Sequence, residues 1–170
     1  MSDPTALPNF SPSNPAQPSA PEAPEPPLAQ RVRDALADLG LEAEIDSDGD
    51  VAFEFSEQRL FVRTADDESG VLSVFGQWSL EDPVPTDPIE RYEACNDVNG
   101  AFNLIKTVLG PHDTLIVSSE HILPSGADVR GLMGLAVPLV MQGVQLWHQR
   151  VTGMSLQEAV EANTRQEDQE

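Results

Sequence analysis

Proline is concentrated near one end of this chain, and that concentration limits where a fold can form. Nine of the fifteen prolines in the 170 residues lie between Pro4 and Pro27. Proline lacks the backbone N–H that helix interiors and central strands need, and only Leu7 and Phe10 are large and apolar in that stretch. Its apolar surface is too small to offset the entropy lost on ordering. We therefore expect residues 1–27 to be a disordered tether. A polyproline ligand is the alternative, although Arg and Lys are missing beside these prolines.

The part of the chain that follows is strongly acidic. The whole chain has 29 Asp and Glu against 9 Lys and Arg, a formal net charge of −20, and Lys106 is its one lysine. Between Leu28 and Ala162 there are 23 acidic and 8 basic side chains, a net charge of −15, so the tails are not the source. Phosphate backbones and anionic lipids bind clustered Lys and Arg. We therefore predict no nucleic-acid and no membrane partner. Two explanations of the acidic charge remain open. It could attract a protein partner with a basic surface, or it could serve only to keep the protein soluble.

The cysteine content and the first residues suggest a compartment. Cys95 is the only cysteine, which excludes an intramolecular disulfide and a cysteine-rich zinc site. Residues 1–9 contain neither a basic cluster nor an apolar run before a small-residue cleavage site, as a secretory signal would. We expect a cytoplasmic protein whose fold depends on packing.

Apolar spacing changes from helical to strand-like between residues 28 and 78. Large apolar residues recur every three or four positions from Leu28 to Leu39, which predicts a helix that ends at Gly40. From Val51 to Phe55 they alternate, which predicts a half-buried strand. An Asp48-Gly49 turn precedes that strand and predicts a hairpin. The other strands expected here are 43–45, 60–64 and 71–78, with an acidic hairpin loop at 66–70.

A second helix is indicated by its first residues. Asp87-Pro88-Ile89-Glu90 places an N-cap, a proline at the first helical position and a glutamate three residues after the cap, and the helix should run to Phe102. A strand pair around Gly110-Pro111 and two more helices complete the pattern, at 104–109, 114–123, 127–148 and 155–162. The predicted fold class is α+β, an antiparallel meander sheet packed by helices in the order α-β-β-β-β-α-β-β-α. The domain should cover residues 28–153, and residues 154–170 should form a short helix and a disordered acidic tail.

The helix predicted at 127–148 is apolar on two sides. One stripe would cover the sheet, and the other would contact the second helix or a second copy of the chain. Its apolar stretch from Leu132 to Trp147 is interrupted by polar Gln142 and Gln145 and by the helix breaker Pro138, and that stretch is shorter than the ~20 residues of a membrane span, so we interpret it as part of a core helix. A homodimer is predicted. Its interface candidates are Leu132, Leu135, Leu139 and Leu146, while the other stripe contains Val129, Met133, Ala136, Val140, Val144 and Trp147.

Residues 46–57 partly match a calcium-binding loop. Asp46, Asp48 and Asp50 alternate, and Glu57 lies where such a loop has its bidentate glutamate. The sixth position, which needs glycine for the sharp bend, is Val51, and that residue begins the predicted strand. A hairpin turn is therefore our interpretation.

The histidines lack the spacing of a metal site. His112, His121 and His148 are far apart along the chain, in a turn, a strand and a helix end. Zinc needs three or four converging ligands. His121 follows Glu120, and we expect the two to form a solvated pair.

A catalytic nucleophile is not indicated either. Ser118 and Ser119 lie within a predicted strand, instead of the glycine-flanked elbow that exposes a nucleophilic serine. Cys95 is expected to be a small buried thiol of the second helix. A phosphate-binding loop is not formed by the glycines of the long helix, Gly131, Gly134 and Gly143. We predict no catalytic residue, no cofactor, no metal and no enzymatic activity.

Four stretches carry a resemblance to a known family. They are Leu36–Asp50 with its DSDGD hairpin, Leu72–Trp78 with Gly76 before its final Trp, the spaced asparagines Asn96, Asn99 and Asn103, and Ser119–Pro124. Over about residues 28–149 the chain resembles the bacterial YbjN family. The resemblance implies a fold like that of type III secretion chaperones and a role in sensory transduction or protein binding. It implies no catalytic residues.

Two functions remain open at this point. The leading one is a non-enzymatic protein-binding module, chaperone-like or regulatory. The alternative is a small-ligand or ion-sensing module, and a hydrolase has only scattered Asp, Glu and Ser in its favour. Asn99 and Asn103 are expected to bond backbone groups where the second helix ends and the next strand begins.

Overall fold

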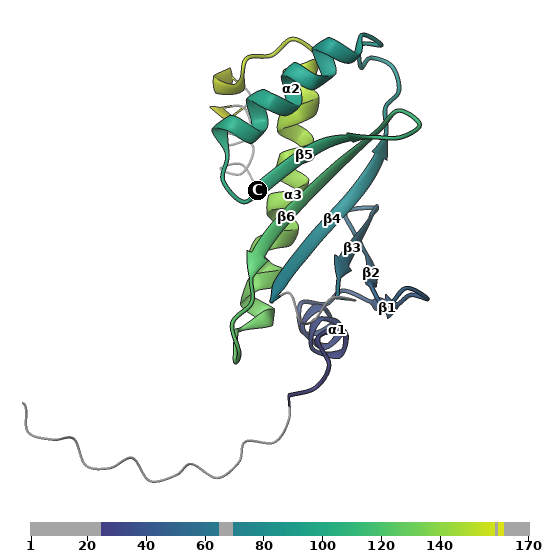
Figure 1. Cartoon of the computed structure of the whole chain (residues 1–170), viewed down its shortest axis with the longest axis vertical. Coiled ribbons are helices and arrows are strands. Elements are labelled where there is room, and N and C mark those ends of the chain that lie inside the picture. Colours follow the sequence, from purple (N-terminus) through teal and green to yellow (C-terminus); the bar gives the residue numbers. More distant parts are fainter. Residues whose placement is uncertain (1–24, 65–69, 159, 162–170) are drawn as a thin grey trace, which may run out of the picture.

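The computed structural model describes residues 25–64, 70–158 and 160–161. The predicted order of helices and strands is confirmed (Figure 1). The elements are α1 (Leu28–Asp38), β1 (Ala43–Ile45), β2 (Val51–Phe55), β3 (Gln58–Arg63), β4 (Val71–Ser79), α2 (Pro88–Ala101), β5 (Ile105–Gly110), β6 (Thr114–Ile122) and α3 (Val129–Val151).

The strands form one antiparallel sheet of the order β1-β2-β3-β4-β6-β5. β1 to β4 are neighbours in chain order, as a meander requires. β4 then pairs with β6 along its whole length, from Val71 opposite Ile122 to Ser79 opposite Thr114. β5 therefore becomes an edge strand, and the last two strands reverse the meander order. The predicted α+β class with an antiparallel sheet packed by helices is confirmed.

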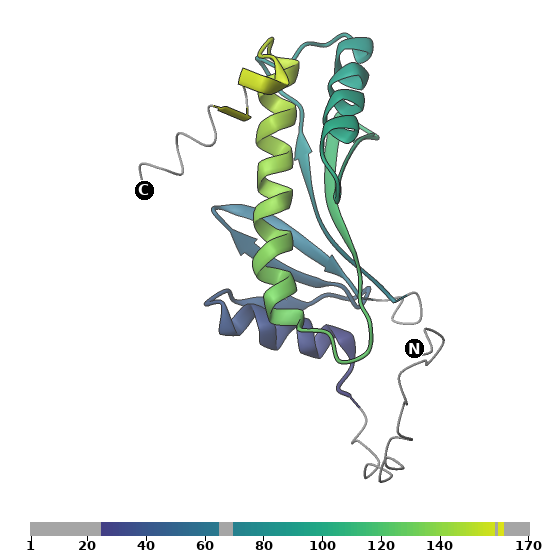
Figure 2. The same cartoon turned by 90° about the vertical axis from the view of Figure 1, so that its left-hand side faces the viewer.

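The helices lie over one face and one edge of the sheet. α3 packs on β4, β5 and β6, α1 packs on α3, β1 and β2, and α2 packs on β5 and α3. Figure 2 shows α3 running along the sheet and α1 crossing near its first turns. Because strand side chains alternate between faces, the residues beneath the helices form the core. Among its fully buried members are Leu36, Leu60, Leu72, Leu115 and Trp147.

Short polar side chains fix the local turns and helix starts. Asp46 Oδ1 accepts hydrogen bonds from the backbone N–H of Asp48 and Asp50, at 2.9 and 3.0 Å, and Gly49 has a φ of 87°. The predicted hairpin at Asp48-Gly49 is thereby confirmed. Asp87 Oδ1 accepts from the N–H of Ile89 at 2.9 Å, which confirms the predicted N-cap of α2.

One turn and one set of helix bounds differ from prediction. Ser56 and Glu57, with φ of 49° and 62°, join β2 to β3 in a two-residue turn that lacks the usual Gly or Asn. α3 begins at Val129, because Asp128 Oδ1 caps it through the N–H of Gly131 at 3.0 Å, and it continues to Val151. The predicted helix bounds of 127–148 were therefore two residues early at the start and three residues early at the end.

α3 is long and apolar enough, by length and composition, to cross a membrane. The prediction that it is too short for a span was wrong, since it has 23 residues and includes Pro138 without ending there. Its stripe of Met133, Ala136, Val140 and Trp147 has no exposed surface and packs in the core. The interpretation of α3 as a core helix therefore depends on packing, not on length.

The ends of the chain are described only in part. The tail predicted at residues 1–27 and the loop predicted at 66–70 fall mostly on residues outside the described ranges, as does the end of the acidic tail. Glu25 already contacts the domain: its carboxylate pairs with Arg31 at 2.6 Å and accepts from the N–H of Gly126 at 3.0 Å. Residues 156–158 and 160–161 are helical.

Replacing Gly143 with alanine should destabilise the fold. A Cβ there would lie 2.8 Å from a methyl of Ile105 and 2.9 Å from a methyl of Val117, so α3 must move off the sheet. Overpacking of this kind costs about 1–3 kcal/mol of unfolding free energy, which urea titration would measure. Gly134→Ala on the same helix meets nothing within 4 Å, and should be neutral or stabilising by up to about 1 kcal/mol. Equal stabilities for the two variants would contradict this account of how α3 packs.

Candidate functional site

The sheet face opposite the helices is the candidate site. Helices α1 and α3 pack against the other face, so the side chains on this face project away from the core. We call it the open face, and Figure 1 looks onto it, with β4, β5 and β6 in front of α3. Cross-strand partners fix its members through the register. They include Glu44, Ala52, Glu54, Arg59, Phe61, Arg63, Ser73, Phe75, Lys106, Val108, Ile116, Ser118, Glu120 and Ile122.

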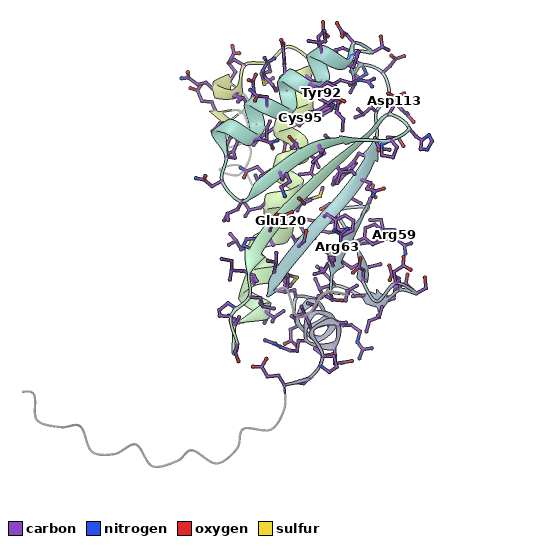
Figure 3. The ribbon with its side chains drawn as sticks, in the orientation of Figure 1. Arg59, Arg63, Tyr92, Cys95, Asp113 and Glu120 are labelled. Carbon is purple, nitrogen blue, oxygen red and sulfur yellow. The ribbon has the colours of Figure 1, made fainter. Side chains whose placement is uncertain are left out.

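Two phenylalanines and two arginines form a stack at the centre of this face. Phe61 of β3 lies opposite Phe75 of β4, and their ring centroids are 5.4 Å apart at an interplanar angle of 23°. The guanidinium carbon of Arg59 is 5.7 Å from the Phe61 centroid, and that of Arg63 is 5.0 Å from the Phe75 centroid. Both arginines are exposed (Figure 3). Each exposed cation–π contact contributes roughly 0.5–1 kcal/mol, so the stack favours this arrangement of the arginines.

Two ion pairs lie on the open face near the stack. Arg59 Nη2 is 3.0 Å from Glu44 Oε1, and Lys106 Nζ is 2.7 Å from Glu120 Oε1. All four side chains are more than two-fifths exposed, so each pair contributes little to stability. Arg59, Arg63 and Lys106 are three of the nine Lys and Arg of the chain. The open face therefore carries three cations, two of them against aromatic rings, and three acidic side chains, Glu44, Glu54 and Glu120.

The open face also exposes aliphatic side chains. Ile122 is 84% exposed, and its cross-strand partner Val71 is 43% exposed. Val108 of β5 is 46% exposed. These residues and the arginine–phenylalanine stack give the face the mixture of apolar, aromatic and guanidinium groups that is typical of protein interfaces.

Cys95 is a core residue, as predicted. Its side chain lies between α2 and α3, where Sγ accepts a hydrogen bond from Trp147 Nε1 at 3.2 Å. Thr107 Oγ1 donates to the Cys95 carbonyl at 3.3 Å. Burial raises the pKa of the Cys95 thiol, which opposes the thiolate form that a nucleophile needs.

The prediction of a solvated pair between His121 and Glu120 was wrong. The two side chains point to opposite faces of β6, and Glu120 pairs with Lys106 on the open face. His121 is 8% exposed beneath the helices, and its Nε2 is 2.8 Å from the hydroxyl of Ser119, which is fully buried. Burial lowers the pKa of His121. Because side chains alternate along a strand, His121 lies on the same face of β6 as the buried Val117, and this pattern would have predicted its burial.

The remaining candidate residues are dispersed. His112 lies in the β5–β6 turn with a φ of 56°, and His148 is exposed near the end of α3. Ser118 is buried within β6. Asp46 uses its carboxylate within its own turn, and Glu57 lies in the next turn. Within the described ranges, no three His, Cys, Asp or Glu side chains form a group that could hold a metal ion.

The proposed dimer surface on α3 becomes smaller. Leu135 is 49% exposed, and Leu132 and Leu139 are half-buried against the core. Leu146 is fully buried, so its place among the interface candidates is corrected: it is a core residue. Both predicted apolar stripes are buried in the second half of α3, because α2 and the sheet enclose that part of the helix.

Asn99 joins the end of α2 to β5. Its Oδ1 accepts from the N–H of Thr107 at 2.7 Å and from the Thr107 hydroxyl at 3.1 Å, and its Nδ2 donates to the Thr107 carbonyl at 3.0 Å. The expected bond to backbone groups is confirmed for Asn99. Asn103, for which the same was expected, is exposed.

Replacing Asn99 with alanine should lower stability by about 1–3 kcal/mol. The Thr107 N–H is buried and would lose its partner, and an unsatisfied buried donor carries a desolvation cost of that size. The exposed Asn103→Ala is the matched control, expected to change stability by less than about 0.5 kcal/mol. Chemical denaturation of both variants measures the difference, and a neutral Asn99→Ala would show that water replaces the amide.

His121 should make stability depend on pH. Its folded pKa is below the ordinary 6.5, so the unfolded chain binds the proton more readily. Stability from this residue is complete above about pH 6.5 and is lost as the pH falls toward the folded pKa. His121→Gln can still bond Ser119 but does not titrate. Between pH 6.5 and 5, the wild type should lose up to about 1.4 kcal/mol per pH unit more than this variant in urea titrations. Parallel stability curves would contradict the expectation.

Known families and solved structures include proteins similar to this chain. Residues 28–131 match the YbjN family model, described as "Putative bacterial sensory transduction regulator". Solved structures similar to this chain include the Yersinia pestis type III secretion chaperone SycH in complex with a stable fragment of YscM2, at 16% identity and a TM-score of 0.48, covering 68% of this chain and 96% of that one. Another is YbjN from E. coli, at 15% identity and a TM-score of 0.49, covering 81% and 92%. No curated protein matches the chain in sequence. Because the family model covers more than half of its length, the chain belongs to the YbjN family.

Proposed function

We propose that this chain is a non-enzymatic protein-binding module with a regulatory role, and that it binds its partner through the open face. The observation that carries the proposal is the stack of Phe61, Phe75, Arg59 and Arg63 on the sheet face opposite the helices. The family description, a sensory transduction regulator, supports a regulatory role in general terms.

The composition of the open face favours a protein over a small ligand. Arginine and aromatic residues are the side chains that most often dominate protein interfaces. Strands lie ~4.8 Å apart, so a face running from β3 through β4 to β6 offers contacts about 10 Å apart across the sheet. The contacts of its two guanidinium groups with the phenylalanine rings favour one arrangement of the arginines before binding, which reduces the entropy lost when they contact a partner.

The chemistry of the buried nucleophiles supports the non-enzymatic part of the proposal. Cys95, Ser118 and Ser119 are each less than a tenth exposed, and the pKa of the thiol is raised. A substrate would have to open the core to reach Cys95 or Ser119, and Ser118 is itself buried although it lies on the open face.

Several sequence-based expectations remain predictions. They include the domain bounds of 28–153, the disordered tails, the cytoplasmic location, the basic character of the partner and the homodimer. The dimer now depends on Leu132, Leu135 and Leu139 of α3 alone.

Reversing the charge of Arg63 should abolish partner binding through the open face. The wild type, Arg63→Glu and the matched control Arg130→Glu would each be used to capture partners from native lysate, with quantitative mass spectrometry as the readout. Arg130 is exposed at the first turn of α3, so the control carries the same charge change away from the open face. Loss of an arginine that dominates an interface costs about 2 kcal/mol or more, roughly a thirty-fold weaker complex.

We expect specific partners to be lost with Arg63→Glu and retained with Arg130→Glu. Phe75→Ser should give the same loss without any change of charge. Identical partner sets for all four proteins would overturn the proposal. Thermal unfolding of each variant checks that its fold is intact.

A further inference from the structure

The two edges of the sheet differ in whether another strand can join them. β5 is one edge, and α2 packs along it while the side-chain amide of Asn99 bonds both the N–H and the carbonyl of Thr107. β1 is the other edge, and in the part of the chain that the structure describes it pairs only with β2. In Figure 1, β1 lies at the side of the sheet far from β5.

The hydrogen-bond pattern shows which groups of β1 point outward. The N–H of Asp46 donates to the carbonyl of Asp50 at 2.8 Å. Bonded pairs alternate along an antiparallel ladder, so Glu44, two residues earlier, bonds Ala52. The N–H and carbonyl groups of Ala43 and Ile45 therefore point away from β2, in the direction from which a further strand would pair.

A hollow of about 340 Å³ lies on the open-face side of β1. Its lining includes the carboxylates of Glu42, Glu44 and Glu54 and the single cation Arg59, over a floor at Ala52. Three acidic side chains against one basic side chain leave a net negative charge there. In an antiparallel neighbour of β1, the residue opposite Glu44 would occupy a non-hydrogen-bonded position, where facing side chains are closest.

The helix side of β1 offers apolar contacts beside charged ones. A second hollow, of about 600 Å³, lies between β1 and α1 and is lined by Ala37, Gly40, Leu41 and Ala43 together with Arg33, Asp34 and Glu42. Ile45 is on the same side and is 42% exposed. Residues of an added strand opposite Ala43 and Ile45 would project into this region, because side chains alternate along a strand.

We propose that β1 is a strand-addition site for an extended segment of a partner protein, paired antiparallel, with the pattern apolar, Lys or Arg, apolar. The basic residue lies opposite Glu44, and the apolar residues lie opposite Ala43 and Ile45. The proposal rests on the protein-binding function proposed above and names the chemistry of the partner. A second copy of this chain fits poorly, because its own Glu44 would approach the same carboxylates.

A synthetic peptide tests the proposal directly. The probe is fluorescein-labelled SITVRVTIS, in which arginine is flanked by two valines. One control peptide has glutamate in place of the arginine, and the other is N-methylated at both flanking valines, which keeps the side chains and removes the backbone donors. Fluorescence anisotropy with the full-length protein should show binding of SITVRVTIS, and at least tenfold weaker binding of each control. If the N-methylated peptide binds as tightly as the probe, backbone hydrogen bonds are not needed and strand addition is overturned. A probe that does not bind at all overturns it too.

Two protein variants place the peptide on β1. Ile45→Pro removes an N–H that points away from β2, so it costs the sheet no ladder bond and should abolish peptide binding. Glu44→Lys changes an exposed residue and should reverse the preference, so that the glutamate peptide binds better than the arginine peptide. Binding that neither variant alters would place the peptide elsewhere and overturn the proposal.

The same variants separate this proposal from the general function. If partner capture from lysate is lost with Arg63→Glu but unchanged with Ile45→Pro, the open face binds protein and the strand-addition proposal fails alone. Loss of the same partners with Ile45→Pro, with the fold intact, supports strand addition. A wild-type dimer that Ile45→Pro converts to monomer in light scattering would assign the edge to a second copy and overturn the proposal.

Discussion

The fit of α3 against the sheet is the contact on which the other features depend. Gly143 allows the helix to approach β5 and β6 so closely that methyl groups of Ile105 and Val117 occupy the space of a side chain. That approach encloses Trp147, whose indole N–H reaches the Cys95 sulfur and so fixes α2 beside α3. α2 in turn places Asn99 against β5 and closes one edge of the sheet. The three helices α1, α2 and α3 therefore all pack on one face and one edge of the sheet.

The opposite face and edge are available as a consequence. A sheet of six antiparallel strands needs cover on only one face to form a core, because alternation puts its large aliphatic residues on that side. The open face is then stabilised locally, by the Phe61–Phe75 stack and its two arginines, instead of by a helix. Exposed edge strands invite unwanted pairing, and charge on a short strand is a common protection. β1 is three residues long and has Glu44 at its centre, a charge that would oppose pairing of two copies at this edge and would not repel a basic strand.

Local signals in the sequence predicted most of the fold. Asp87-Pro88 predicted the start of α2, and Asp48-Gly49 predicted a hairpin, because each provides its own hydrogen bonds or backbone freedom. The turn at Ser56-Glu57 was missed because neither residue type favours a positive φ, and the register of β2 and β3 imposes it. Leu146 was misplaced because helical periodicity cannot show how far neighbouring elements enclose a helix. The open face was not predicted, although Arg59, Phe61 and Arg63 alternate along one strand, since Phe61 and Phe75 meet only through tertiary pairing.

Charge acts at two distances in this molecule. The field of the domain charge of −15 extends over about a Debye length, ~8 Å at physiological salt, so it repels a second copy at that distance and would attract a basic partner, if the partner is basic as predicted. At contact, the nearest side chains matter most. Arg59 already pairs with Glu44, so a partner on the open face would bring acceptors chiefly to Arg63, and a strand beside β1 would bring a donor to the group of Glu42, Glu44 and Glu54. A partner that used both proposed surfaces would present carboxylates or carbonyls to the stack and a cation to the edge. This two-part requirement is more selective than a uniformly acidic surface, which any basic protein would satisfy.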